Sequence, residues 1–340
     1  MEYRSLGRTG IQVSRFGLGA MMLGDWGNTD LDACSRIVNG ALDGGINLVD
    51  TADVYGAGQN EEIVGDAIRD RRHEVVLCTK FHNPVGETDD PNCRGNSRRW
   101  IMQAVDDSLR RLGTDWIDVY QAHRPDPATD IRETVDTLND LVGAGKIRAW
   151  GTSTFPAEQL VEAHWAAERL AAIGPHSEQS PYSILCRGIE RDVLPTALRY
   201  GMGVLTWSPL SGGWLTGKYS RENPSPPSTR GSTHPDHFDG GNPAKFDAVE
   251  RLAKIAGDAG LSLTHMALAW NVEHPGVTAA LLGPRTEEQL DDLLGASEIQ
   301  LSSEILDEID HVVAPGANVN PADVDWVPPG LSPSRRRRRR

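Results

Sequence analysis

The feature that most constrains the fold of this chain is an alternation of short apolar runs with amphipathic helical stretches, about 30 residues apart. The runs are rich in β-branched residues, which favour strands. We predict strands at 15–18, 47–50, 75–79, 116–121, 147–151, 177–179, 203–206 and 278–281. Between several of them, apolar residues recur every three to four positions and predict helices, at about 31–42, 101–112, 131–141 and 160–170.

Successive βα units favour a parallel sheet, because consecutive parallel strands need crossover helices. We therefore predict an α/β fold, a (β/α)8 TIM barrel, preceded by an N-terminal β-hairpin around Gly7 and Gly10 that closes the barrel bottom. The alternative is an open, doubly wound sheet. Its Gly-x-Gly-x-x-Gly nucleotide loop is missing, because GLGAMMLG at 17–24 lacks that spacing, so we expect no Rossmann fold.

No domain boundary or long-period repeat interrupts the alternation. We predict one barrel domain at 1–314 and a C-terminal tail at 315–340 with a disordered arginine end. A connection at about 208–243, rich in Gly, Pro and Ser, is too long for an ordinary loop, so we expect it to be functional. An extra helix is predicted around 262–272.

The charge of the chain is concentrated in an unusual way. The formal net charge is −14, but six arginines at 335–340 contribute positively, so the rest of the chain carries −20. An acidic body repels polyanions, so we expect no nucleic-acid partner. The arginine run is either a nucleic-acid or membrane-surface arm or a solvated tail, and we favour the tail, since like charges repel one another.

Composition also bears on the compartment. No run of 18 apolar residues occurs, so a membrane span is not expected. The opening MEYRSLGRTG has no apolar segment of a secretory signal. The four cysteines show neither paired spacing nor a Cys-x-x-Cys, which favours free thiols in a reducing compartment. We expect a cytoplasmic protein.

Polar side chains follow three successive predicted strands. Asp50 and Tyr55 come after the second, Lys80 ends the third, and His123 follows the fourth. Taken singly, each has an ordinary structural explanation, such as a turn cap or a satisfied polar group. In a barrel, however, the C-terminal strand ends meet at one mouth, where active sites lie. Their convergence there predicts a catalytic site.

Several ordered segments carry a resemblance to a known family. These are DTADVYG at 50–56, TK at 79–80, QAHRPDP at 121–127 and TWSPLSGGWLTGKY at 206–219. Together they resemble the aldo-keto reductase superfamily over about 4–310, in the branch that holds bacterial aldo/keto reductases and the β subunits of voltage-gated potassium channels. The resemblance implies a barrel that binds NADPH and reduces an aldehyde or ketone to an alcohol by hydride transfer.

By position, Asp50, Tyr55, Lys80 and His123 match the family's catalytic tetrad. The chemistry of these side chains supports such roles. A tyrosine with a pKa of about 10 is a weak acid, and a neighbouring ammonium lowers that pKa by favouring the phenolate. Tyr55 is thus the expected proton donor, with Lys80 beside it, Asp50 holding the lysine charged and His123 polarising the carbonyl.

The resemblance also implies contacts to the cofactor. Ser153 and Gln179 match residues that hold the nicotinamide carboxamide, and Trp207 matches the aromatic that stacks under the ring. Thr154 stands where Asn is commonest, which leaves its role open. The remaining implied contacts are Ala20, Met21 and Asp50, and on the loop that crosses the pyrophosphate Ser208, Pro209, Leu210, Ser211, Gly212, Lys218 and Arg230.

The segment GPRTEEQLDD at 283–292 resembles the family's contact to the adenosine end, with Gly283, Arg285, Gln289 and Asp292 as the implied residues. A guanidinium at the opening of a helix can pair with a 2′-phosphate, and the helix N-terminus favours negative charge. Arg285 therefore predicts NADPH rather than NADH. Leu293 replaces a frequent Asn in this segment.

The substrate pocket is expected beside Tyr55 and His123, with Met22, Trp26, Phe81 and His82 as its lining. An apolar and aromatic lining with few charges suits a neutral carbonyl compound. The ten histidines show no ligand spacing such as His-Glu-x-x-His, so no metal is expected.

Three other functions remain as alternatives. The first is an NADPH-binding regulatory or sensor subunit with little turnover, which the intact His123 disfavours. The second is a lyase that uses Lys80 as a Schiff-base nucleophile, which would need an uncharged lysine. The third is nucleic-acid binding through the arginines at 335–340. We expect a monomer, with a homo-oligomer as the alternative.

Overall fold

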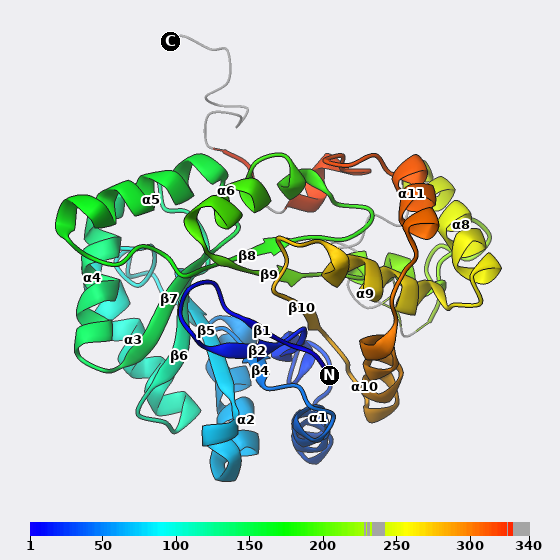
Figure 1. The fold of residues 1–340 in the computed structure, drawn as a ribbon. Coiled ribbons are helices and arrows are strands. Elements are labelled where there is room, and N and C mark those ends of the chain that lie inside the picture. The colour runs from blue at the N-terminus through cyan, green and yellow to red at the C-terminus, as the bar shows by residue number, and fades with distance from the viewer. Residues whose placement is uncertain (228, 230–231, 233–241, 325, 329–340) are drawn as a thin grey trace.

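In a computed structural model, the chain forms a closed barrel of eight parallel strands surrounded by helices (Figure 1). The structure describes residues 1–227, 229, 232, 242–324 and 326–328. The strands neighbour one another in chain order, and β10 closes the barrel against β3. They are β3 Phe16–Gly19, β4 Leu48–Asp50, β5 Val76–Phe81, β6 Ile117–Ala122, β7 Ile147–Ser153, β8 Ser177–Pro181, β9 Gly203–Trp207 and β10 Ala279–Leu282. The predicted TIM barrel is confirmed.

Helices cover the outside of the barrel. The α-helices of the described residues are α1 Leu31–Asp43, α2 Gln59–Ile68, α3 Arg98–Leu112, α4 Ile131–Gly143, α5 Ala157–Leu170, α6 Val193–Tyr200, α8 Pro243–Asp258, α9 Leu263–Glu273, α10 Glu287–Leu294 and α11 Ser303–Val312. Side-chain caps mark several starts: Asp30 accepts from Ala33 N, Ser97 from Trp100 N and Asp130 from Arg132 N. The predicted extra helix at 262–272 is α9.

Short 3₁₀ turns lie between these elements, and three of them, η1, η2 and η5, carry predicted site residues. They are η1 Ala20–Met22, η2 Tyr55–Gly58, η3 Arg69–Glu74, η4 Gly188–Glu190, η5 Ser211–Thr216, η7 Gly295–Glu298 and η8 Pro321–Val324. The patterns in the sequence did not single out α2, α6, α8 or α11. For α8 a start signal was present, because Asn242 caps the helix and Pro243 occupies its first turn.

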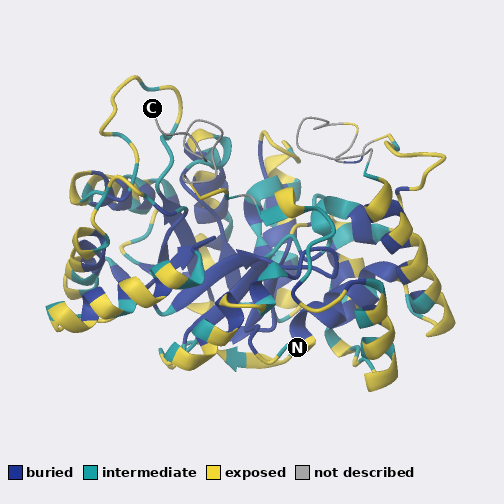
Figure 2. Cartoon of the chain, turned by 90° about the horizontal axis from the view of Figure 1, so that it is seen from above, coloured by how far each residue is buried: buried dark blue, intermediate teal, exposed yellow. Residues whose placement is uncertain are grey.

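The hairpin before the barrel is also confirmed. Strands β1 Tyr3–Ser5 and β2 Gln12–Ser14 pair antiparallel and lie across one end of the barrel (Figure 1). Leu6 and Val13 are fully buried there, in a cluster with residues from the barrel strands: Leu48, Cys78, Val119, Leu205, Ala279 and Leu281. This cluster forms the barrel floor. A larger apolar layer packs between strands and helices, whose outward faces are exposed (Figure 2).

Part of the predicted C-terminal tail packs onto the barrel. Asn318 forms a β-bridge with Cys186, Val319 N donates to Leu185 O at 2.9 Å, and Lys245 Nζ lies 2.9 Å from Asp323 Oδ1. The arginines at 335–340 lie outside the described residues. All four cysteines are free thiols, as predicted. Among the described helices, none is both long and apolar enough to cross a membrane.

Candidate active site

The fold brings the four predicted catalytic residues to one mouth of the barrel. Asp50 is the last residue of β4, Lys80 lies near the end of β5 and His123 directly follows β6. Tyr55 opens the turn η2 that follows β4. Because all strands are parallel, their C-terminal ends share one rim, which is where barrel active sites lie.

Asp50 and Lys80 form a buried ion pair at the base of this mouth. Lys80 Nζ lies 2.6 Å from Asp50 Oδ2 and donates to Thr51 O at 2.8 Å, and Lys80 has no exposed surface. Burial by itself would lower the pKa of Lys80, but Asp50 and Tyr55 outweigh it and leave that pKa above its usual value. Lys80 is therefore an ammonium, which disfavours the Schiff-base alternative.

Tyr55 lies directly above this pair. Lys80 Nζ is 5.2 Å from the centroid of the Tyr55 ring. Burial raises the pKa of Tyr55, Lys80 lowers it, and burial prevails, so the pKa lies above its usual value. The effect of Lys80 on this pKa has the predicted sign, but desolvation is larger and the net shift is upward. The phenol consequently carries its proton at neutral pH.

His123 faces the tyrosine as a neutral ring. The two ring centroids are 6.0 Å apart with a T-shaped arrangement. Burial, together with the positive charges of Lys80 and Arg124, holds the pKa of His123 well below its usual value. Its Nδ1 has no hydrogen-bond partner within the described part of the chain. A neutral imidazole can donate one hydrogen bond to a bound molecule or accept one from it.

A glutamine that sequence reasoning missed completes the Asp50 environment. Asp50 Oδ1 accepts from Gln179 Nε2 at 2.7 Å and from Gln121 Nε2 at 3.4 Å. Gln179 was a predicted cofactor residue, whereas Gln121 was not predicted. The available signal was its position, because Gln121 lies beside Lys80 in the register of β5 and β6.

Left-handed backbone conformations cluster at the same rim. Four residues with a Cβ have positive φ values here: His82 (141°), Thr154 (60°), Ser208 (55°) and Ser211 (51°). Such values are uncommon for residues with a Cβ and concentrate at functional sites. Thr154, which is β-branched, follows β7 directly, and Asn, the commoner residue in the family, tolerates this region better. Each of these residues follows the end of a barrel strand.

The nicotinamide residues predicted from the resemblance lie along this rim. Ser153 ends β7 and its Oγ donates to Gln179 O at 2.9 Å, while Thr154 N donates to the same oxygen at 2.9 Å. Ala20 is buried, and Met21 is partly exposed in η1.

The pyrophosphate residues predicted from the resemblance lie beyond β9. Trp207 ends that strand and is partly exposed. Ser208, Leu210, Ser211 and Gly212 are partly exposed, Pro209 is buried and Lys218 is exposed. Arg230 lies outside the described residues.

The predicted adenosine residues lie just before α10 and along it. Asn28 Nδ2 donates to Arg285 O at 2.9 Å and so ties this segment to the loop after β3. Gln289 Oε1 accepts from Arg285 N at 2.9 Å, and Asp292 Oδ1 lies 3.2 Å from His265 Nε2. Gln289 and Asp292 thus already have partners within the chain. A side chain at Gly283 would meet open space.

The predicted pocket residues differ in their exposure. Phe81 is fully buried and its ring packs 4.9 Å from that of Tyr120, because successive strand residues point to opposite faces and Lys80 faces inward. Trp26, by contrast, is 41% exposed and its ring centroid lies 5.6 Å from that of Tyr55. Met22 is partly exposed in η1, and His82 Nδ1 lies 2.9 Å from Asn96 Oδ1.

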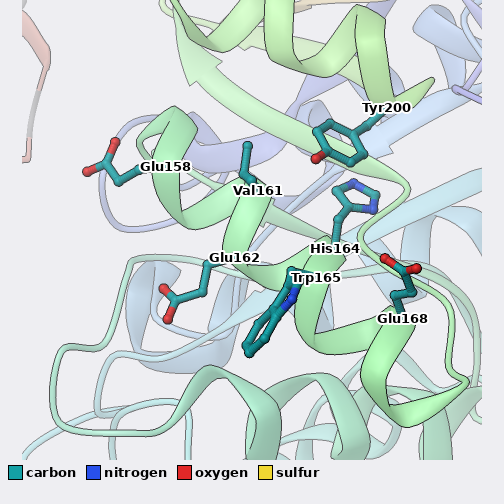
Figure 3. A pocket seen from close by; sticks show the side chains of 7 residues that line it. All are labelled: Glu158, Val161, Glu162, His164, Trp165, Glu168 and Tyr200. Atoms are coloured by element: carbon teal, nitrogen blue, oxygen red, sulfur yellow. The ribbon is translucent and has the colours of Figure 1, made fainter.

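Two hollows are lined by residues other than the four predicted catalytic ones. One of about 410 Å³ is formed by α5 and the end of α6, where His164 stacks on Tyr200 at 4.3 Å and Trp165 is exposed (Figure 3). None of the predicted site residues lines it. A second hollow of about 250 Å³ lies beside α3, with Asp53 among its lining residues. Burial and Glu61 hold the pKa of Asp53 well above its usual range. The convergence of the strand ends, rather than the size of a hollow, locates the site.

No group of three or more metal-ligating side chains occurs among the residues described.

The Aldo/keto reductase family pattern matches residues 15–314. "Probable voltage-gated potassium channel subunit beta" from Oryza sativa subsp. japonica is 37% identical, covering 92% of this chain and 97% of that protein. "Uncharacterized oxidoreductase YrpG" and "Aldo-keto reductase YhdN" from Bacillus subtilis are each 38% identical, covering 96% and 92% of this chain and 100% and 94% of their own lengths. The chain therefore belongs to the aldo/keto reductase family, a family of oxidoreductases.

Proposed function

We propose that this protein is an NADPH-dependent oxidoreductase that reduces an aldehyde or ketone to an alcohol, with Tyr55 as the proton donor. The observation that carries the proposal is the arrangement around the tyrosine. A buried Asp50–Lys80 ion pair lies below Tyr55, with Nζ 5.2 Å from its ring, and the neutral His123 lies beside it.

When bound, NADPH supplies the hydride that reduces the carbonyl carbon. Tyr55 then gives its phenolic proton to the developing alkoxide oxygen, so the product is a neutral alcohol and the tyrosine is left as a phenolate. Lys80 stabilises that phenolate by charge, and Asp50 keeps Lys80 charged and oriented. His123, being neutral, donates a hydrogen bond to the carbonyl oxygen and holds it against Tyr55.

The residues around the rim fit a dinucleotide. Gln179 in β8 lies beside Ser153, the last residue of β7, so the two would hold a carboxamide, and Trp207 would lie under the nicotinamide ring. Ser211, Gly212 and Gly213 are three successive residues with positive φ, so the chain after β9 turns sharply beside the mouth. Ser211 N and Gly213 N donate to Ser208 O and Leu210 O at 2.8 and 3.0 Å, which fixes this turn.

The preference for NADPH rests on Arg285. This residue lies two positions before α10, so its guanidinium and the helix N-terminus would both favour a 2′-phosphate.

The substrate class follows from the charge state of the mouth. Lys80 is neutralised by Asp50, and burial lowers the pKa of both His123 and His82, so both rings are neutral. The positive Arg124 guanidinium beside them donates to His123 O at 2.6 Å. Trp26 adds an exposed aromatic wall. A neutral aldehyde or ketone fits such a lining better than an ionised substrate.

The test is NADPH oxidation with a panel of aldehydes and ketones, in wild type and Tyr55→Phe. We expect turnover of at least one carbonyl, and a loss of at least about a hundredfold without the hydroxyl, because general-acid catalysis contributes about that much. NADPH binding, followed by fluorescence, should be unchanged. Activity that survives in Tyr55→Phe would contradict the proposed mechanism.

A second candidate function has support from the comparisons. Relatives from Oryza sativa and Arabidopsis thaliana are named probable voltage-gated potassium channel subunit beta. A regulatory or sensor protein that binds NADPH with little turnover would show cofactor binding but no steady-state oxidation with any carbonyl of the panel.

We also expect the protein to be a monomer, which sedimentation velocity would test.

A further inference from the structure

The turn that carries Tyr55 has an unusual backbone. Gly56, Ala57 and Gly58 follow one another with φ values of 55°, 53° and 98°. Ala57 has a Cβ, so this left-handed conformation is costly and persists only where the surroundings enforce it. Helix α2 begins immediately afterwards, at Gln59. The first turn of α2 therefore directly adjoins the turn that carries Tyr55.

Asn60, in that first turn, uses its side-chain amide to join three segments. It is 1% exposed. Its Nδ2 donates to Ala20 O at 2.7 Å and to Leu23 O at 2.6 Å, and its Oδ1 accepts from Thr51 Oγ1 at 2.5 Å. Asn60 thereby fixes the loop after β3 to the residue that follows Asp50.

Glu61, the next residue, makes the corresponding links on the other side. It has no exposed surface. Its Oε1 accepts from Thr79 Oγ1 at 2.6 Å, and its Oε2 accepts from Arg111 Nε at 2.7 Å. Thr79 directly precedes Lys80 in β5. Arg111 also packs on the turn itself, since a Cβ at Gly58 would lie 2.7 Å from Arg111 Cδ.

We propose that Asn60 and Glu61 are positioning residues, which set where Tyr55 lies relative to Lys80 and to the substrate loop at 20–23. The proposal rests on Tyr55 being the proton donor. Neither residue is placed to touch the reacting atoms, because both side chains point into the packing between α2 and the strands. Their effect is geometric, and a displacement of about 1 Å in an active site can cost about a hundredfold in rate.

The two residues have separable effects. Asn60 holds the loop that carries Met22, a predicted pocket residue, so its loss should weaken substrate binding. Glu61 ties the Tyr55 turn to the strand of Lys80, so loss of its bond to Thr79 should slow proton transfer. The expected result is a split between KM and kcat that a general loss of stability would not produce.

The variants are Asn60→Ala and Thr79→Val, the second of which removes only the hydroxyl that bonds Glu61. The matched control is Thr137→Val, because Thr137 is equally buried and its hydroxyl donates to Glu133 O at 2.7 Å within α4, away from the site. With a carbonyl that the wild type reduces, we expect KM to rise at least about fivefold in Asn60→Ala and kcat to fall at least about tenfold in Thr79→Val. The control should stay within about twofold.

Hydrogen exchange gives a second readout that needs no turnover. We expect amides at 20–23 to exchange at least about tenfold faster in Asn60→Ala, and those at 54–58 in Thr79→Val, with both segments unchanged in the control. If the wild type reduces no carbonyl but exchange changes as expected, the proposed function fails and the positioning role stands. Unchanged exchange, or kinetic changes that the control shares, overturns the positioning role. Should Asn60→Ala not fold, Thr79→Val and its control decide alone.

Discussion

Burial decides the chemistry of individual residues in this site more than their sequence neighbours do. Tyr55 shows this most clearly. The sequence places Lys80 near it and correctly indicates that the ammonium lowers the pKa of the phenol, yet desolvation raises that pKa by more. His123 becomes a neutral ring for the same reason. The placement of these residues at one mouth was predictable, but their protonation states depend on how much water the fold excludes.

Glu178 is a buried carboxyl next to a predicted cofactor residue. It lies in β8 before Gln179, is fully buried, and accepts from Ser180 Oγ at 2.8 Å and from Phe155 N at 3.2 Å. Burial raises the pKa of Glu178 to about 7. The folded chain therefore keeps a proton that the unfolded chain has already lost between about pH 4.5 and 7.

From this shift we expect the free energy of unfolding of the wild type to fall as the pH rises from about 4.5 to above 7. Ionisation of Glu178 costs about 3 kcal/mol, because each pKa unit corresponds to about 1.4 kcal/mol. Glu178→Gln removes the ionisation, so the stability of the variant relative to wild type should increase by about 2–3 kcal/mol between pH 5 and pH 8. Urea unfolding at several pH values measures the difference. The exposed Glu162→Gln is the control, and a parallel pH dependence in wild type and Glu178→Gln would contradict the assignment.

Among the structural elements, α2 and α3 approach most closely at one glycine. A Cβ at Gly65 would lie 2.4 Å from Leu112 O, which is backbone and cannot move aside as a flexible side chain would. Gly65 lies inside α2, so in an exposed helix its replacement by alanine would be stabilising. The close approach of the two helices reverses that expectation.

We expect Gly65→Ala to lower the free energy of unfolding by about 1–3 kcal/mol, the usual cost of overpacking. Gly257→Ala in α8 is the matched control, because no atom lies within 4 Å of its Cβ position. That control should be neutral or more stable by up to about 1 kcal/mol. Urea denaturation of both variants measures this, and a Gly65→Ala protein as stable as wild type would refute the contact.

For the molecule as a whole, the barrel separates a stability end from a chemical end. The hairpin places Leu6 and Val13 in the barrel floor, while the tetrad lies at the opposite ends of the strands. In barrels of this kind, residues at the bottom serve stability and residues at the top serve chemistry.

Shortening a side chain in the barrel floor should therefore lower the free energy of unfolding without changing cofactor binding. We expect Leu6→Ala to lower the free energy of unfolding by about 2–5 kcal/mol through the cavity it leaves. The affinity for NADPH should stay within about twofold, because the site is at the other end. Thermal unfolding and fluorescence titration measure the two quantities, with Leu198→Ala, at a 53% exposed position, as the control. A large loss of affinity in Leu6→Ala would show that floor and mouth are coupled.

The sequence by itself determined the barrel, the hairpin and the strand ends that carry the site. These follow from local signals, because periodicity, crossover length and the position of a polar residue after an apolar run are all readable within about 30 residues. Asp50, Lys80 and His123 could be placed at one mouth for this reason alone. Phe81, predicted beside them, is fully buried against Tyr120, because successive residues of a strand point to opposite faces and a one-residue shift changes the face.

Tertiary structure alone decided how the site is held. Asp50 meets Gln179 across 129 positions of sequence, and Glu61 meets Arg111 across 50. No local pattern encodes such pairs, because they depend on which side chains the closed barrel turns toward one another. The protonation of Tyr55 likewise depends on burial by distant segments. The chain thus specifies its elements locally, whereas the positions and charges of its reactive groups arise only when those elements pack together.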